Sequence, residues 1–337
     1  MFVTGYGERM ANIKDIAKKA GVSVATVSRV INNKSDVSDA MRKYILKIMN
    51  DVGYVPNTIA KNLSHGRSNL IAVMLPTLNT PFFSDLLTEI ENEANKNGYN
   101  ILLFNSSDDR NKVEFYLNSM KSNFVCGAII NSVAVTKEDI GSLEKNGIRT
   151  ITFDRTPDDH LSSSIRVRHR LGGQIATRHL VEMGCKKLLM ISGEREDRIT
   201  HERMLGYTDV VNEIPGESPV VLNSDLTSPG GYAVMREFLK SGQVCDSLFC
   251  ANDAMAFGAI RACADYGIRV PEDVAVIGYD NSSMSGFYLP ALSSVDQCLR
   301  EVGRLSVETL VSLIRSGSEP VHLTVSPELV IRGSTRR

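Results

Sequence analysis

The sequence predicts an α/β protein in which parallel sheets are flanked by helices, preceded by an all-α helix-turn-helix head. Two patterns predict this class. From Leu70 onward, apolar runs alternate with amphipathic helical stretches, and residues 12–32 have the spacing of two short helices around a glycine. With 337 residues and 42% hydrophobic content, the chain can form two or three units with sizeable cores.

The head begins with a pair of short helices. Apolar residues of the first follow helical spacing, at Ile13, Ile16, Ala17 and Ala20. Gly21 then breaks the run, and Ser23 can cap a second helix. The second helix turns Val27, Val30 and Ile31 toward the first. This order predicts a helix-turn-helix, although an ordinary helical hairpin would show the same spacing.

The outward face of the second helix carries small, polar and cationic side chains. With the capping serine they form a candidate DNA-reading set: Ser23, Val24, Ala25, Thr26, Ser28, Arg29 and Asn32. Such side chains suit the base edges of a groove and the phosphates beside it. We therefore interpret this helix as a recognition helix.

Charge is unevenly distributed along a chain whose net charge is −1. Residues 10–67 hold ten Lys and Arg against four Asp, a charge of +6, whereas residues 68–337 carry −7. A basic head on an acidic body suits a protein that touches a polyanion with one part only. This pattern favours nucleic acid as a partner of the head.

A third helix and a short segment follow the pair. Ser38 can cap a helix that continues to Val52, and Gly53 ends it. The segment after Pro56 has room for only about two helical turns before Gly66, too few to be stable alone in water. Leu63 in this segment suits a wedge between base steps in a minor groove.

The order IKDIAKKAGVSVATVSRVINN, a third helix and then GYVPNTIAKNLSHGRSN resembles the lactose-repressor (LacI/GalR) family of bacterial transcription regulators. The resemblance implies that the short segment is a hinge helix that orders on the operator and inserts its leucine, here Leu63. It also places the recognition positions on Val24, Ala25 and Arg29. Tyr54 and Asn57, at the start of the hinge region, complete the expected DNA-binding residues.

The expected organisation has four parts. Residues 1–9 are an N-terminal extension, 10–56 the helix-turn-helix domain, 57–67 the hinge helix and linker, and 68–337 an effector-binding and dimerisation domain. In this last part, strands are expected at 70–75, 100–104, 127–130 and 150–153, with helices at 82–97, 110–122 and 136–146. A second set is expected from Ser163, with helices at 170–183, 200–213, 228–241 and 253–266 and strands at 188–192, 220–222, 247–251 and 274–279.

Polar and aromatic residues recur after these strands. They are Phe82 and Phe83 after the first, Asp154 and Arg155 after the fourth, and, in the second set, Arg203, Asn252, Asp253, Asp280, Asn281 and Gln297. Ligands of parallel sheets bind outside the carboxyl ends of the strands. Carboxylates and guanidinium groups can grip adjacent hydroxyls while aromatic rings cover the C–H faces of a sugar. Taken singly, two phenylalanines at the start of a helix are more often core, and Asp253 or Asp280 after a strand is more often a helix cap.

The body of the chain is also similar to periplasmic sugar-binding proteins, particularly ribose-binding proteins, through TLNTPFF, TFDRT, ANDAMAFGAIRA and VIGYDNS. The resemblance implies a two-lobed, periplasmic-binding-protein-like core. It also implies that the effector is contacted by Phe82, Phe83, Asp154, Arg155, Arg203, Asn252, Asp280 and Gln297.

One stretch departs from the family pattern. Before Leu171-Gly172-Gly173 the family usually has an Asp-Asn pair, whereas this chain has Arg168-His169-Arg170. If Arg168 and His169 face the cleft, they favour an anionic ligand; if they face solvent, a neutral pentose fits better.

No enzymatic motif is present: the chain has no GxxxxGK[ST], HExxH or GxSxG, and no GxGxxG after its first strand. The six cysteines form no CxxC pair and have no accompanying histidines, so neither a metal nor a cofactor is expected. We found neither an apolar run of membrane-spanning length nor a signal peptide, which predicts a cytoplasmic protein without membrane contact. The rival from another class is a sugar-handling α/β enzyme fused to a DNA-binding head.

These observations predict a repressor that binds a pseudo-palindromic operator as a homodimer and is released by a small sugar, with ribose or a related pentose as the expected effector. The alternatives are a repressor that senses a sugar phosphate or sugar acid, and a purine-sensing or activating member of the family.

Overall fold

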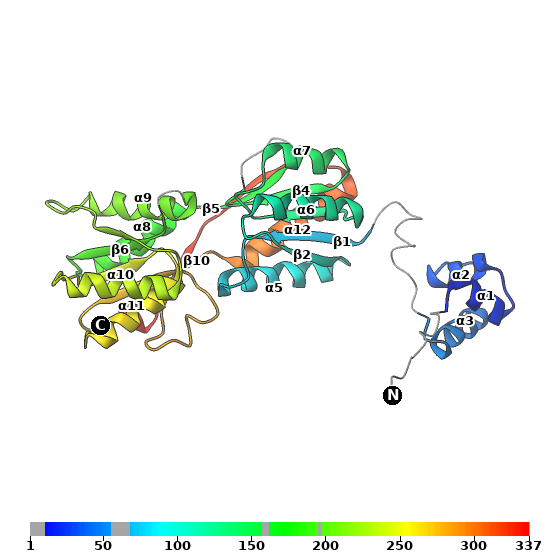
Figure 1. Cartoon of the computed structure of the whole chain (residues 1–337), viewed down its shortest axis with the longest axis horizontal. Coiled ribbons are helices and arrows are strands. Elements are labelled where there is room, and N and C mark those ends of the chain that lie inside the picture. Colours follow the sequence, from blue (N-terminus) through cyan, green and yellow to red (C-terminus); the bar gives the residue numbers. More distant parts are fainter. Residues whose placement is uncertain (1–10, 55–67, 157–161, 195–196, 337) are drawn as a thin grey trace, which may run out of the picture. The chain divides into compact units, whose positions relative to one another are not determined.

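The computed structural model of the chain describes residues 11–54, 68–156, 162–194 and 197–336. The chain divides into two compact units, Met1–Ser68 and Asn69–Arg337. The first unit is helical, and the second is a two-lobed α/β body (Figure 1). The predicted α/β class with a helical head is thereby confirmed. Within the described residues, no helix is long and apolar enough to span a bilayer.

The head consists of three helices, α1 (Ile13–Ala20), α2 (Val24–Ile31) and α3 (Asp39–Asp51). Each start is capped, because the side chains of Asn12, Ser23 and Ser38 accept hydrogen bonds from backbone N–H groups of the first turns. Gly21 ends α1 with a φ of 67°, in the left-handed region that favours glycine. The tight turn that joins α1 to α2 therefore follows from the sequence.

One apolar cluster holds the three helices together. It consists of Ile16, Ala17, Ala20, Val27, Val30, Ile45, Ile48 and Met49. Ile16, Val27 and Ile45 are almost fully buried, and each comes from a different helix. Burial of these side chains against one another fixes the orientation of α2, whose remaining face is left to solvent.

The first lobe is built on a six-stranded sheet in the order β11-β5-β4-β3-β1-β2. Its strands are β1 (Leu70–Leu75), β2 (Asn100–Asn105), β3 (Gly127–Ile130), β4 (Arg149–Phe153), β5 (Ser163–Val167) and β11 (His322–Val325), all parallel to their neighbours. Its helices are α5 (Pro81–Lys96), α6 (Arg110–Ser122), α7 (Lys137–Lys145) and α12 (Leu299–Ser316).

Both faces of the first sheet are covered. Alternate residues of β1 lie in different cores: Ile71 and Val73 pack with α5 and α12, whereas Ala72 and Met74 pack with α6 and α7. Successive residues of a strand face opposite sides of the sheet, and here both sides are covered by helices. The continuous apolar run of β1 follows from this. As a consequence, the open part of this lobe is the edge at which the strands end.

The second lobe repeats the design with the sheet order β12-β10-β9-β8-β6-β7. Its strands are β6 (Leu188–Ser192), β7 (Val221–Asn223), β8 (Ser247–Cys250), β9 (Ala275–Asp280), β10 (Ser293–Asp296) and β12 (Glu328–Val330). Its helices are α8 (His169–Glu182), α9 (Arg198–Val211), α10 (Ser228–Lys240) and α11 (Asp253–Asp265), and a 3-10 turn, η1, covers Gly333–Thr335. β12 pairs antiparallel with β10, an exception to the predicted parallel arrangement.

The division between the lobes corrects one sequence expectation and adds one helix that was not expected. The second set was expected to start near Ser163, but β5 pairs with β4 in the first sheet, and the chain enters the second lobe only afterwards. After β10 the chain returns through α12, a helix that the sequence analysis did not assign and that packs on α5 in the first lobe. Beyond β11 it crosses again to β12. Each lobe is thus completed by distant segments.

Two glycines bring α8 and α9 together. A Cβ on Gly173 would lie 2.2 Å from the carbonyl oxygen of Arg203, and one on Gly206 would lie 2.1 Å from that of Arg170. Only glycine permits this approach of the two backbones. The close packing places the side chain of Arg203 beside the first residue of α8, His169.

Candidate functional site

The outer face of α2 is open to solvent in the head. Val24 is 40% exposed, and Ala25 and Arg29 are also exposed. The Arg29 guanidinium lies 3.5 Å from the Asp36 carboxylate, but both side chains are more than half exposed, so this pair holds Arg29 only weakly. A small apolar side chain, a methyl group and a guanidinium group are therefore all exposed on α2, and side chains of these kinds can contact base edges.

Four further residues of the expected DNA-binding set are engaged within the helix itself. The Ser23 hydroxyl accepts from the Thr26 backbone N–H at 3.1 Å and lies 2.9 Å from the Thr26 hydroxyl. The Asn32 amide donates to the Ser28 hydroxyl at 3.4 Å. These bonds orient polar atoms along the outer face and stabilise the start and the end of α2.

The last part of the expected DNA-binding set is described only in part. Tyr54 is half-buried and packs against the apolar cluster of the head, which gives it a structural role. Asn57 and Leu63 lie outside the described residues, as does the expected hinge helix. Their roles therefore stay predictions.

The body contains a cleft of about 650 Å³ to which both lobes contribute. All eight residues expected to contact an effector line it: Phe82, Phe83, Asp154, Arg155, Arg203, Asn252, Asp280 and Gln297. The volume lies within the range of small-molecule sites. The structure thus brings together residues that are up to 215 positions apart in the sequence, from Phe82 to Gln297.

The position of the cleft follows from the parallel sheets. Asp154 comes directly after β4, Asn252 lies between β8 and α11, and Asp280 is the last residue of β9. The carboxyl ends of the strands converge there, as expected for doubly wound sheets. Asp154 and Asp280 have positive φ values, 34° and 113°, which ordinary residues rarely adopt. Such backbone strain is concentrated at functional sites.

Aromatic rings cover parts of the cleft wall. Phe82 and Phe83, at the start of α5, meet edge to face with centroids 4.9 Å apart. Phe257 and Tyr288, which the sequence analysis did not select, stack with centroids 4.5 Å apart and also line the cleft. These rings provide apolar surfaces for the C–H groups of a ligand.

Several buried polar side chains lie on the second-lobe side of the cleft. The Arg203 guanidinium donates to the Ala251 carbonyl at 2.5 Å and lies 3.4 Å from Oδ1 of Asp280. The same oxygen accepts from the Gln297 amide at 2.6 Å. Burial raises the pKa of Asp280 to about 7, although Arg203 and Gln297 oppose the rise and the nearby Asp253 carboxylate adds to it. Asp280 can therefore be present in both protonation states near neutral pH.

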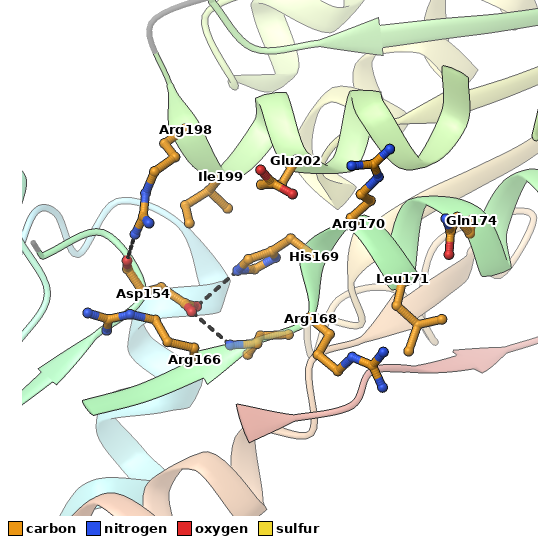
Figure 2. Close-up of a pocket in the computed structure, with 11 residues that line it drawn as sticks. Asp154, Arg166, Arg168, His169, Arg170, Leu171, Gln174, Arg198, Ile199 and Glu202 are labelled. Carbon is orange, nitrogen blue, oxygen red and sulfur yellow. Dashed lines mark hydrogen bonds and ion pairs between the residues drawn. The ribbon is translucent and has the colours of Figure 1, made fainter. Parts of the chain in front are cut away.

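The Arg168-His169-Arg170 stretch divides between solvent and cleft. The side chains of Arg168 and Arg170 are exposed, and Arg170 pairs with Asp209 at 2.6 Å. His169 is buried and lines the cleft, with Nε2 3.1 Å from Oδ2 of Asp154 (Figure 2). Of the two placements that the sequence left open, the solvent-exposed one is correct for Arg168 and Arg170. His169 instead faces the cleft.

Two other expected contacts already have protein partners. Arg155 lies 3.0 Å from the Asp108 carboxylate of the first lobe and 3.7 Å from Asp197, which caps α9 in the second. The Asn252 side chain caps α11 by accepting from Met255 N–H and donates to the Leu226 carbonyl at 2.8 Å. Arg155 thus links the lobes, and Asn252 mainly shapes the cleft wall.

Two polar residues of the cleft were not among the expected effector contacts: Asn131, and Thr80 of the stretch TLNTPFF. The Asn131 amide oxygen and the Thr80 hydroxyl are buried and have no hydrogen-bond partner within the described part of the chain. Gln297 Oε1 shares this property. Asn131 directly follows β3, so the rule that selected residues after the other strands could have found it.

More carboxyl groups than cationic groups line the cleft. Five carboxylates line it, from Asp154, Asp197, Asp225, Asp253 and Asp280, against two guanidinium groups, from Arg155 and Arg203. Ser282, Ser285 and Ser294 hydrogen-bond to Asp253, whose pKa burial raises. No group of side chains in the described ranges is arranged to hold a metal ion.

Two family models match the chain. Residues 12–57 match bacterial regulatory proteins of the lacI family, and residues 177–335 match a periplasmic binding protein-like domain. Among curated relatives, the transcriptional repressor PurR of Haemophilus influenzae is 32% identical, with 97% of this chain and 99% of the relative covered. A ribose operon repressor of Halalkalibacterium halodurans is 29% identical over 97% of this chain and 98% of its own length.

Solved structures agree with this similarity. The lac repressor dimer bound to its operator and an anti-inducer matches with a TM-score of 0.86 and 27% identity, covering 98% of this chain and all of that one. A LacI-family regulator of Enterococcus faecium with bound ribose matches with a TM-score of 0.73 and 28% identity, covering 79% of this chain and 98% of that one.

Proposed function

The chain belongs to the LacI family of bacterial regulatory proteins and is a DNA-binding transcriptional repressor, and we propose that a small neutral sugar bound in the cleft of its body releases it from the operator. Ribose or a related pentose is the first candidate. This family consists of transcription regulators, so the enzymatic alternative has no support from the relatives.

The observation that carries the proposal is the surplus of hydrogen-bond acceptors in the cleft. Carboxylates at Asp154 and Asp280 are joined by buried acceptors of Asn131 and Gln297 that have no partner in the described part of the chain. A ligand with several hydroxyl groups can donate to each of these acceptors, and leaving them unpaired costs free energy. A polyol matches this set better than a ligand with few donors.

Charge separates the alternatives. A sugar phosphate or sugar acid would bring negative charge to a cleft in which five carboxyl groups, two of them with pKa values raised by burial, face two arginines. A purine base offers few N–H donors for the acceptors, although the aromatic rings suit its flat shape. The relatives include a PurR repressor as well as a ribose operon repressor, so the purine class is tested beside the sugars.

The head supplies the DNA contacts in this proposal. Val24, Ala25 and Arg29 read base edges in the major groove, and the hinge segment with Leu63 enters the minor groove. Two heads on a pseudo-palindromic operator require a homodimer. Phe287 and Leu289, which are 86% and 88% exposed on one loop of the body, are the apolar surface we expect a second copy to cover.

Release follows from linkage between the two ligands. The sugar changes operator affinity only to the extent that it binds one arrangement of the lobes better than another. Arg155 pairs with carboxylates of both lobes, and Arg198 of α9 donates to the Asp154 carbonyl. A ligand between the lobes therefore changes the contacts of Arg155 and Arg198, which connect one lobe to the other.

Calorimetry of the full chain tests the ligand class. Ribose, ribose 5-phosphate, a sugar acid and a free purine base are titrated into wild type and an Asn131→Ala variant, with the exposed Asn118→Ala as matched control. We expect ribose to bind and Asn131→Ala to weaken it by about 1 to 2 kcal/mol, while the control is unchanged. Binding of the purine or of charged sugars alone would refute the proposal.

A further inference from the structure

His169 lines the cleft, which is one of the two placements that the sequence left open for it. It is the first residue of α8, is 5% exposed, and makes polar contacts through both ring nitrogens. Nδ1 lies 3.4 Å from Nε of Arg203 and 3.3 Å from the Tyr279 hydroxyl, and Nε2 lies 3.1 Å from Oδ2 of Asp154. Figure 2 shows the imidazole pointing toward the Asp154 carboxylate.

The partners determine where the ring proton is. A guanidinium N–H can only donate, so Nδ1 of His169 must accept from Arg203. Nε2 has no hydrogen bond of good geometry within the described residues, but the acceptor nearest to it is the Asp154 carboxylate, with Oδ2 at 3.1 Å, so the proton of a neutral ring lies on Nε2 on the side of that charge. The imidazole is therefore a neutral Nε2–H tautomer, and a second proton on Nδ1 would confront the guanidinium.

The electrostatic surroundings agree with a neutral ring. Burial lowers the pKa of His169 below its usual value, and the Arg203 and Arg198 cations lower it further, whereas only Asp154 raises it. Tyr279, the remaining group against the ring, has a pKa raised by burial and stays protonated. His169 therefore adds no positive charge to the cleft at neutral pH.

His169 bridges the two lobes, because it lies between Asp154 of the first lobe and Arg203 of the second. Oδ1 of Asp154 accepts from the Val167 backbone N–H at 2.8 Å, which fixes one side of the carboxylate, and His169 lies against the other oxygen. Through Arg203 the bridge continues to Asp280 and Gln297. Four of the residues expected to contact the effector thus belong to one polar chain, in which His169 joins Asp154 to Arg203.

A glycine makes room for this arrangement. A Cβ on Gly172 would lie 2.3 Å from the Tyr279 hydroxyl oxygen, which is the atom that contacts His169 Nδ1. Tyr279 can occupy its position only because this residue of α8 has no side chain. The hydroxyl and Arg203 together hold the imidazole from the second-lobe side.

We propose that His169 is a specificity-determining residue of the cleft: as a neutral bridge it fixes Asp154 and Arg203 as an acceptor and donor pair for adjacent hydroxyls of an uncharged sugar, and it excludes phosphorylated and acidic sugars. The inference rests on the proposed function. A cationic histidine would instead offset part of the carboxylate charge and admit an anionic ligand.

The test compares two substitutions with a control on the same helix. His169→Gln keeps a neutral acceptor and donor on one side chain, whereas His169→Leu removes both. His179→Gln changes a second α8 histidine, which contacts Thr335 and does not line the cleft. Ribose and ribose 5-phosphate are titrated by calorimetry into each full-length variant, and melting temperatures establish that each variant is folded.

We expect roughly 10- to 100-fold weaker ribose binding for His169→Leu, a loss below about tenfold for His169→Gln, and no change for His179→Gln. If His169→Leu does not fold, two other measurements test the inference. They are the ribose affinity of His169→Gln relative to wild type and nitrogen NMR of the wild-type ring. NMR should show the proton on Nε2 at neutral pH, with signals assigned by their loss in His169→Gln.

Three outcomes would overturn the inference. They are unchanged ribose affinity in His169→Leu, a ring proton on Nδ1 or a doubly protonated ring at neutral pH, and tight binding of ribose 5-phosphate by wild type. If wild type binds none of these sugars, the proposed function fails as well. Wild-type ribose binding with an indifferent His169 rejects only the inference and leaves the proposed function standing.

Discussion

The guanidinium carbon of Arg203 lies 3.7 Å from the centre of the Tyr279 ring. Both side chains are buried in the second lobe, and the guanidinium has its donors directed at Ala251, Asp280 and His169. Stacking on the ring holds the guanidinium in one plane while its edge makes these contacts. Arg203 is therefore pre-organised before any ligand enters.

Arg203→Lys should lose effector binding although it keeps the charge. An ammonium group cannot stack on Tyr279 and reach the several acceptors around it at once. We expect ribose affinity to fall by about 2 kcal/mol or more in calorimetry. Arg178→Lys, on the exposed face of α8, is the matched control and should bind like wild type. Equal affinities for both variants would show that Arg203 does not contribute through its geometry.

Ribose binding should strengthen as pH rises from 6 to 8. The pKa of Asp280 is about 7, and an ionised carboxylate both accepts from Gln297 and pairs with Arg203. If the ligand binds the ionised form, affinity at pH 6 should be about tenfold weaker than at pH 8. Asp280→Asn should abolish this dependence. A wild-type affinity that does not change over this range would contradict the assignment.

Arg155→Gln should weaken the link between the two lobes. Its guanidinium lies near carboxylates of both, Asp108 and Asp197, and all three side chains are largely buried. We expect a loss of about 1 kcal/mol in ribose affinity. We also expect ribose to draw the lobes together, and the resulting decrease in radius of gyration, measured by small-angle scattering, should be smaller in this variant. Arg149→Gln, which breaks a pair with Glu144 within the first lobe, is the control.

Exchanging Val24 and Ala25 should change the operator sequence that is preferred. These exposed residues stand at the start of α2, where a recognition helix meets base edges. We expect about 1 to 3 kcal/mol of altered discrimination per base pair, measured by selection from a random pool. Lys14→Ala should mostly reduce the salt dependence of binding. Selection of the same operator by both proteins would refute the recognition assignment.

Leu63→Ala tests the expected hinge. If Leu63 is a minor-groove wedge, the change should cost a few kcal/mol of specific operator affinity, because phosphate contacts persist while the wedge is lost. Nonspecific affinity should be nearly unchanged in titrations of random DNA. Equal losses on operator and random DNA would show that Leu63 has no role specific to the operator.

Local patterns predicted most elements of the fold. The two-residue period of β1 and the caps at Ser23 and Ser38 are determined by neighbouring residues, so they can be recognised without tertiary information. Local patterns do not determine which lobe a strand belongs to. β5 lies in the first sheet because it pairs with β4 and β11. That pairing depends on contacts between segments far apart in the chain.

The cleft shows the same limit. Residues directly after strands, such as Asp154 and Asp280, could be selected because parallel strands end at a common edge. The role of His169 could not, since its burial depends on Gly172, Arg203 and Tyr279 meeting around it. The charged neighbours Arg168 and Arg170 favoured a solvent-exposed stretch. In the structure α8 starts at His169, and the two arginines are exposed while His169 is buried.

The most direct test of the account is a titration of the operator complex. The full chain is bound to an operator selected from a random pool, and fluorescence anisotropy follows the labelled DNA as ribose, ribose 5-phosphate or a free purine base is added. We predict release by ribose alone, and no release by ribose in the Arg203→Lys variant. Retention of the DNA at saturating ribose, or a response of wild type only to the purine or the phosphate, would contradict it.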